Sequence, residues 1–324
     1  VGQMPTLRDR FHTRVADRPL LADGGIGTLL FSRGIPQRAC LDELVATRPE
    51  LIAAIHREYL EAGAELIETA TFGANRLRLA TYGLSSEAGR FARRGAQLAR
   101  EARDVAGRAD ALVGGSIGPL GAPTRELAEQ DTTLVRAAFR EQIEGLLEGG
   151  VDLFVIETFS DLDHLLLAVD EARRASDLPI VAQMTFGEDL AAPDGTTPEG
   201  AAEALSGAGV DGIGVNCGVG PITCLDALER MGPSTAAVAR SILPNAGLPQ
   251  RLEGRFVYAA GPDYFGSMVP RLIAAGARIV GGCCGTTPEH IAAMRTALDA
   301  VATEDGGRAE ARAAPAAAYG PVVV

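Results

Sequence analysis

The sequence lacks tryptophan and lysine altogether, and aromatic residues make up only 5% of its 324 residues. It also lacks an excess of basic charge, because the formal net charge is -12 and the acidic residues are spread through the chain. A nucleic-acid partner would require a basic stripe or patch, so this class of function is disfavoured. No apolar run approaches the roughly 18 residues needed to span a bilayer, which argues against a membrane protein.

Cysteine is scarce as well. Five cysteines in a chain of 324 residues do not make a disulfide framework. Cys283 and Cys284 are adjacent, and adjacent cysteines rarely pair because a vicinal disulfide needs a distorted backbone. The first residues show no secretory pattern. A reducing cytoplasm is therefore the predicted location.

Short apolar runs alternate with amphipathic stretches along most of the chain. We predict strands at residues 19–22, 66–69, 111–115, 153–156, 179–184, 212–215, 255–259 and 278–281. Helices are predicted between them, for example at residues 49–62, 87–106, 132–148, 162–175, 198–207 and 264–275. Apolar strands alternating with helices predict a parallel sheet covered by helices. Eight such units predict an α/β protein with a (β/α)8 TIM barrel, which takes about 250 residues plus insertions.

The main alternative is an open doubly wound sheet. It is disfavoured because the chain after the first predicted strand lacks a Gly-x-Gly-x-x-Gly sequence. We expect the barrel to occupy residues 1–302, with a helix and a long loop at 231–254 before the seventh strand. Residues 303–324 have no helical or strand periodicity, which is typical of a tail or of a linker to another domain.

Polar residues gather where the predicted strands end. The ligand chemistry of such a barrel collects at the carboxyl ends of its strands, so these residues are the candidates for a site. The candidates are Asp23, Gly24 and Gly25 after the first strand, Thr71 and Phe72 after the second, Ser116 after the third, Glu157 after the fourth, Asn216 and Cys217 after the sixth, and Cys283 and Cys284 after the eighth.

Three of these candidates are cysteines, and they predict a zinc site. Three thiolates leave zinc one open coordination position, which is typical of a catalytic site. Adjacent side chains of a strand point to opposite faces, so Cys283 and Cys284 can reach one ion only if the backbone turns there. The glycines beside them, Gly281, Gly282 and Gly285, allow such a turn. The alternative is that both are small buried hydrophobes. Cys40 and Cys224, on a loop and a helix, are predicted to be structural, and no histidine is assigned to the metal.

The acidic candidates predict a site for a substrate amine. Glu157 follows four apolar residues, so we expect its carboxylate inside the barrel mouth, where it should be paired. A substrate ammonium would pair it, and an internal salt bridge is the alternative. Asp23 could also bind an amine, or could satisfy backbone amides of a turn. Thr71 and Ser116 could hold a substrate carboxylate.

Taken in order, these segments resemble the homocysteine S-methyltransferase family from about residue 19 to residue 300. The segments that carry the resemblance are Asp23-Gly24-Gly25-Ile26-Gly27-Thr28, Glu68-Thr69-Ala70-Thr71-Phe72, Gly115-Ser116-Ile117-Gly118-Pro119, Glu157-Thr158, Asn216-Cys217 and Gly281-Gly282-Cys283-Cys284-Gly285-Thr286-Thr287-Pro288. The double cysteine with an upstream Asn-Cys is the most specific of them.

The resemblance implies a zinc-dependent barrel that methylates homocysteine to methionine. It implies that Cys217, Cys283 and Cys284 bind the zinc and that Asp23, its two following glycines and Glu157 contact homocysteine. Thr71, Phe72, Ser116 and Asn216 then belong to the pocket wall. Family members differ in methyl donor. The missing tryptophan counts against betaine, whose ammonium is held by aromatic side chains.

Gly285 resembles the corresponding residue of cobalamin-dependent methionine synthase and of bacterial proteins that fuse this barrel to methylenetetrahydrofolate reductase. It therefore favours a donor delivered by a fused or separate cobalamin or folate domain, with S-methylmethionine as the other choice. Two other functions compete. A catalytically inactive zinc-binding scaffold has no need of Asp23 and Glu157. A metal-free lyase or aldolase barrel would use a lysine at a strand end, and the sequence has none.

Overall fold

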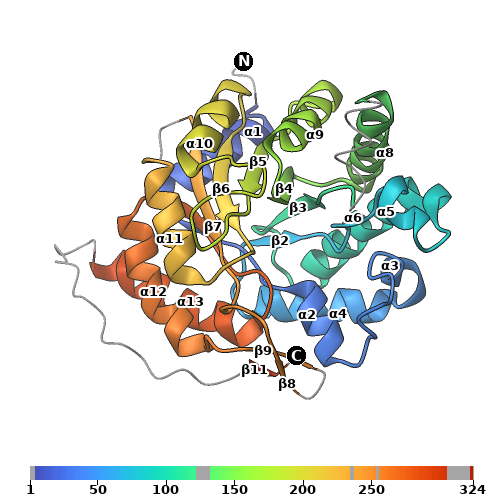
Figure 1. The fold of residues 1–324 in the computed structure, drawn as a ribbon. Helices are drawn as coiled ribbons and strands as arrows, with labels where there is room; N and C mark the ends of the chain where they lie inside the picture. Colours follow the sequence, from blue (N-terminus) through green and yellow to red (C-terminus); the bar gives the residue numbers. More distant parts are fainter. Residues whose placement is uncertain (1–3, 122–131, 234–236, 253–254, 305–321, 324) are drawn as a thin grey trace.

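The computed structural model describes residues 4–121, 132–233, 237–252, 255–304 and 322–323. Eight parallel strands form one sheet in the order β1-β10-β7-β6-β5-β4-β3-β2. The strands are β1 (Leu20–Leu21), β2 (Leu66–Glu68), β3 (Leu112–Ile117), β4 (Leu153–Phe159), β5 (Ile180–Met184), β6 (Gly212–Asn216), β7 (Ala239–Leu243) and β10 (Ala277–Val280). A parallel bridge between Ala22 and Leu66 joins the first strand to the last in this order. The predicted (β/α)8 TIM barrel is confirmed (Figure 1).

Helices lie between the strands along the chain and surround the barrel (Figure 1). They are α2 (Ile26–Ser32), α3 (Leu44–Thr47), α4 (Pro49–Glu61), α5 (Arg76–Ala80), η1 (Ser85–Glu87), α6 (Ala88–Val105), α8 (Thr132–Gly149), α9 (Leu162–Ala175), α10 (Pro198–Gly207), α11 (Pro221–Arg230), α12 (Pro262–Ala274) and α13 (Pro288–Glu304). Several begin with proline, whose fixed φ suits the first helical position. None of the described helices is long and apolar enough to cross a membrane.

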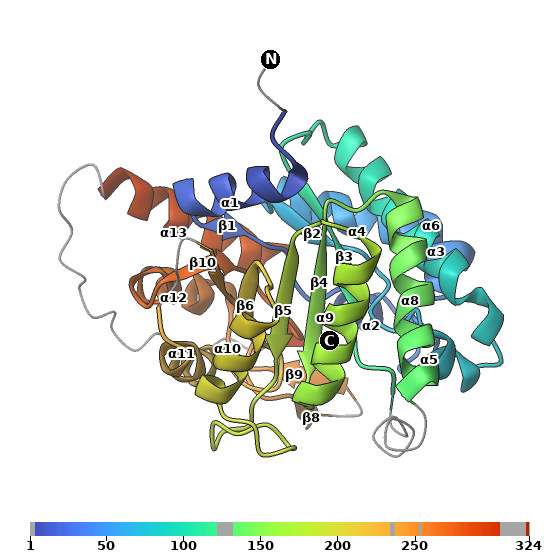
Figure 2. The same ribbon diagram turned by 90° about the horizontal axis from the view of Figure 1, so that it is seen from above.

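The strands fill one end of the barrel with apolar side chains. Helix α1 (Leu7–Asp17) lies across the end at which the strands begin, as Figure 2 shows, and its Phe11 and Val15 pack against Leu20 and Leu153 from the barrel interior. An ion pair between Arg14 and Glu65 fixes the helix there. Because apolar side chains fill the barrel interior at this end, we look for the site at the opposite end, where the strands finish.

The seventh barrel strand was predicted in the wrong place. The structure puts β7 at Ala239–Leu243, inside the stretch predicted as a helix and loop. The predicted strand at 255–259 instead contains β9 (Arg255–Tyr258), which pairs antiparallel with β8 (Gln250–Leu252) outside the barrel. Two polar residues within β7 make this strand hard to recognise from the sequence. Arg240 is buried and donates to the carbonyls of Met231 and Gly232 at 2.9 Å. Ser241 accepts a hydrogen bond at 2.7 Å from Gln183 of β5, two strands away in the sheet.

The described residues reach both sides of the predicted boundary at residue 302. Helix α13 continues to Glu304, two residues beyond residue 302. Residues 305–321 and 324 lie outside those described, so the predicted tail at 303–324 is described only at its edges. Val322 and Val323 form β11, which pairs antiparallel with β9.

Candidate metal and substrate site

A cavity of about 390 Å³ opens at the carboxyl ends of the barrel strands. Its floor carries the three predicted cysteines together with Ser116 and Glu157. Gly24, Gly25 and Phe72, also predicted from the sequence, line its wall. The structure therefore brings residues from six separate strand ends to one place, as expected at the carboxyl end of a closed barrel.

The sulfur atoms of Cys217, Cys283 and Cys284 lie within 4.8 Å of one another, and the first and last are 3.9 Å apart. Ligands about 2.3 Å from a tetrahedral zinc are roughly 3.8 Å from each other, so this spacing fits the ion. They are the only group of this kind among the residues that the structure describes, and none of the histidines there lines the cavity. Cys40 and Cys224 are buried, and neither lines the cavity nor belongs to this group of thiols.

The backbone is held in uncommon conformations to aim these thiols. Cys217 has φ of 57°, a left-handed conformation that a non-glycine residue adopts only when its surroundings impose it, and its N–H donates to the carbonyl of Leu243 at 3.0 Å. Thr158, which follows Glu157, has φ of 63° for the same reason. Strain at two residues beside candidate ligands is typical of a functional site.

The adjacent cysteines face one point because the chain turns directly after them. Gly285 has φ of 80°, whereas Gly281 and Gly282 have no positive φ and serve instead to leave space. A Cβ added to Gly282 would lie 2.4 Å from Thr286 Oγ1. The prediction that glycines permit the turn is therefore confirmed for one of the three glycines.

Replacing Gly285 with alanine should lower the free energy of unfolding by more than about 2 kcal/mol and weaken metal binding, since a left-handed residue with a Cβ costs about 1–2 kcal/mol by itself. The new Cβ would also lie 2.3 Å from the ring of buried Tyr258. Urea unfolding and zinc titration measure both effects. The matched control is Gly207→Ala on α10, where nothing lies within 4 Å of the added Cβ. Equal stability of the two variants would contradict the prediction.

Mutual hydrogen bonds move the pKa values of the three thiols apart. Hydrogen bonds from the thiols of Cys283 and Cys284 lower the pKa of Cys217 to about 3. The same contacts raise the pKa of Cys283 and of Cys284. Three thiolates can therefore coexist here only around a cation, so the chemistry of the donor set fits a soft divalent metal.

Glu157 is a buried carboxyl group without a basic partner. It is 7% exposed and accepts hydrogen bonds from Ser116 Oγ at 2.6 Å, Asn216 Nδ2 at 3.1 Å and Thr158 Oγ1 at 3.3 Å. Burial raises the pKa of Glu157. No ion pair joins it to an arginine or histidine within the described part of the chain, so the internal salt bridge considered above is not found. Its cavity side is open to a cationic ligand.

Three predicted residues stand directly behind the cavity wall. Asp23 is 1% exposed and accepts a hydrogen bond from the backbone N–H of Glu68 at 3.0 Å. Thr71 is fully buried and donates to the carbonyl of Ser116 at 2.8 Å. Asn216 holds Glu157 on one side and accepts from Thr158 N–H at 2.8 Å on the other. These residues fix the groups that line the cavity.

Glu68 lines the cavity, although we did not count it among the candidate residues. It ends β2, two residues after Leu66, which is part of the barrel core. The period of two along a strand puts both side chains on the same, inward face. That spacing is the signal in the sequence for an inward-facing Glu68. Residues after the strand end are not the only candidates for the site.

The cavity is also lined by aromatic side chains and by two side chains of opposite charge, Arg78 and Asp42. Phe31, Phe72 and Tyr82 line it. The guanidinium carbon of Arg78 lies 5.1 Å from the centre of the Phe72 ring. This cation–π contact uses a face of the ring that could otherwise hold a cationic ligand.

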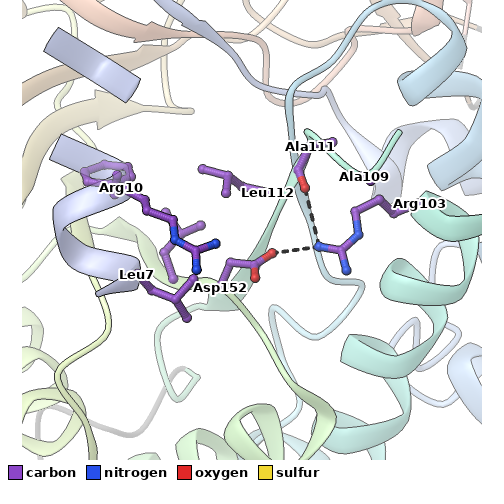
Figure 3. Close-up of a pocket in the computed structure, with 9 residues that line it drawn as sticks. Leu7, Arg10, Arg103, Ala109, Ala111, Leu112 and Asp152 are labelled. Atoms are coloured by element: carbon purple, nitrogen blue, oxygen red, sulfur yellow. Dashed lines mark hydrogen bonds and ion pairs between the residues drawn. The ribbon is translucent and has the colours of Figure 1, made fainter. Parts of the chain in front are cut away.

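A second cavity, of about 270 Å³, lies at the opposite end of the barrel beneath α1. Figure 3 shows its polar groups, where Arg103 donates to Asp152 at 3.0 Å and to the carbonyl of Ala111 at 3.4 Å. Leu7 and Leu112 supply apolar walls. The cavity is lined by no cysteine or histidine, so the chemistry of this protein is not expected there.

Comparison with known proteins agrees with this site. The family model described as homocysteine S-methyltransferase matches residues 20–298. The chain belongs to the homocysteine S-methyltransferase family. Methionine synthase of Mycobacterium leprae is 35% identical over 300 residues, covering 88% of this chain and 24% of the relative, and that of Mycobacterium tuberculosis is 34% identical. The chain thus spans about a quarter of the length of these relatives.

Solved structures of the same family share the fold. The homocysteine methyltransferase MmuM from Escherichia coli, in an oxidised form, has a TM-score of 0.73 and 27% identity over 88% of this chain and 98% of its own. Its metallated form has a TM-score of 0.71 and 27% identity over 86% of this chain and 96% of its own. A methyltransferase from Methanosarcina mazei, 14% identical with a TM-score of 0.59, shares the fold alone.

Proposed function

We propose that this protein catalyses zinc-dependent transfer of a methyl group to the thiol of homocysteine, forming methionine. One observation supports this most: three free thiols share a cavity with Glu157, a buried carboxyl group that has no basic partner among the described residues. Homocysteine has a thiol at one end and an ammonium group at the other. The cavity offers a complementary group to each.

Cys217, Cys283 and Cys284 would hold the zinc. Zinc bound there would lower the pKa of the substrate thiol, so that it reacts as an electron-rich thiolate near neutral pH. Glu157 would bind the substrate ammonium through a charge-assisted hydrogen bond. Ser116 and Asn216 would keep that carboxylate ionised and in place by donating to it.

The cavity favours a donor without fixed positive charge. Arg78 already covers one face of the Phe72 ring, so that face is not free to hold the cationic centre of betaine or S-methylmethionine. A methyl group delivered by a cobalamin- or folate-binding domain, fused or separate, would not need this ring face. The likeness to methionine synthases, of which the chain covers only a quarter, supports the same choice. Free thiols in the site agree with a reducing cytoplasm as the location.

Proton linkage tests the proposal. Homocysteine arrives as a thiol with a pKa of about 8.5 and would bind as a thiolate, so binding to zinc-loaded protein should release a proton at pH 7. Below that pKa, affinity should rise with pH. Calorimetry in buffers of different ionisation enthalpy measures the release. Homoserine should bind poorly, because a hydroxyl group is far harder to deprotonate.

Equal affinity for homoserine and homocysteine, or binding without proton release, would refute this activation of the thiol. Methionine formation is then assayed with methylcobalamin, S-methylmethionine and betaine as donors. Zinc binding without methionine from any of them would instead favour the inactive scaffold.

A further inference from the structure

The cavity contains a carboxyl group that the function above does not use. Glu68 extends from the end of β2 into the same space as Glu157. Its Oε1 is buried and receives no hydrogen bond from any of the described residues. A buried acceptor without a donor is costly, and a ligand that supplies the missing donor would remove this cost.

Glu68 and Glu157 line the same cavity, and their carboxyl groups are close enough to hydrogen-bond when one of them is protonated. Two ionised carboxylates would repel each other and have no hydrogen to share, so this arrangement favours one proton on the pair. Glu157 already accepts from Ser116 and Asn216, whereas no described side chain donates to Glu68. Donors stabilise the ionised form of Glu157, while burial and the neighbouring carboxyl groups of Glu157 and Asp23 raise the pKa of Glu68. The distribution of donors therefore favours Glu68 as the protonated member of the pair.

We propose that Glu68 is a positioning residue for the substrate amino group, donating a hydrogen bond to Glu157 and accepting one from the ammonium of homocysteine. This rests on the proposed function. One ionised carboxylate then faces one ammonium, so the filled amine subsite is neutral. Asp23 helps to position Glu68, because its carboxyl oxygen Oδ2 accepts a hydrogen bond from the backbone N–H of Glu68 at 3.0 Å.

Glutamine can reproduce both hydrogen bonds, and this gives a sharp test. The amide of Glu68→Gln would donate to Glu157 and its oxygen would accept from the ammonium. Glu68→Met keeps the length of the side chain and loses both. Affinity is measured by calorimetry on zinc-loaded protein for homocysteine and for 4-mercaptobutyrate, which lacks the amino group. The quantity compared is the ratio of the two affinities.

Glu68→Met should lower this ratio by about 10- to 100-fold, and Glu68→Gln should keep it within about 3-fold of the unmodified protein. If Glu68 had only a structural role, Glu68→Met would lower the affinities for both ligands equally and leave their ratio unchanged. That result would overturn the inference. An equal loss of ratio in both variants would show that Glu68 acts as an ionised group, and would overturn the hydrogen-bond arrangement. Failure of the unmodified protein to bind homocysteine would instead refute the proposed function.

Discussion

Replacing Cys217 with serine is expected to weaken zinc binding by roughly 100- to 1,000-fold and to remove methionine formation at equimolar zinc. Structural zinc sites in proteins bind with about 10–16 kcal/mol, so one of four ligands accounts for roughly 2.5–4 kcal/mol. Cys217 has no replacement nearby, because Cys283 and Cys284 are already assigned as ligands and no further cysteine or histidine of the described residues lines the cavity. Competition with a chromophoric chelator measures the zinc affinity, and a coupled assay measures methionine.

Cys224→Ala is the matched control. Cys224 lies on α11 and is fully buried, and its Sγ is 3.8 Å from the carbonyl of Cys217. It does not belong to the group of three thiols. This variant should bind zinc as tightly as the unmodified protein. Loss of zinc in the control, or full zinc affinity in Cys217→Ser, would mean that the metal ligands have been assigned wrongly.

Glu157→Gln should lower homocysteine affinity by roughly 10- to 150-fold while zinc stays bound. The substitution preserves the shape and removes the charge, and a charge-assisted hydrogen bond contributes about 1.5–3 kcal/mol. The amide would also turn one N–H group toward donors that now meet an oxygen, such as Ser116 Oγ. Calorimetry with homocysteine and metal analysis of the same sample separate the two effects.

A second buried glutamate serves as the control for this variant. Glu65 is 4% exposed and pairs with Arg14, Arg18 and Arg295 at the other end of the barrel. Glu65→Gln should reduce stability and leave homocysteine affinity unchanged. If Glu157→Gln bound homocysteine as tightly as this control does, the carboxylate of Glu157 would be a structural group.

The sequence predicted the barrel well because most of its strands are apolar on both faces. Runs such as Leu153 to Ile156 are buried on both faces of the sheet. Their continuous apolar sequence predicts a strand even when the segments that pack against it are not known. Strand β7 was missed for the opposite reason. Arg240 and Ser241 are polar, and only carbonyl groups and a glutamine supplied by other parts of the chain make their burial favourable.

The candidate site was also predictable from the sequence only in part. The three cysteines could be found because their residue type is rare and its position at strand ends is informative. The carboxyl groups could be found only in part. Asp23 follows its strand and was favoured, yet it lies behind the wall, whereas Glu68 lies within its strand and faces the cavity.

By itself the sequence determined the α/β barrel class, the end of the barrel that carries the chemistry and the three thiols suited to zinc. Local periodicity and residue type are sufficient for these conclusions. Tertiary structure alone decided that Glu68 and Glu157 meet, that Cys217 is held in a left-handed conformation and that Arg78 covers Phe72. The reason is physical: each of these facts is a distance between segments far apart in the chain, or a strain imposed by such segments. No local pattern encodes either of them.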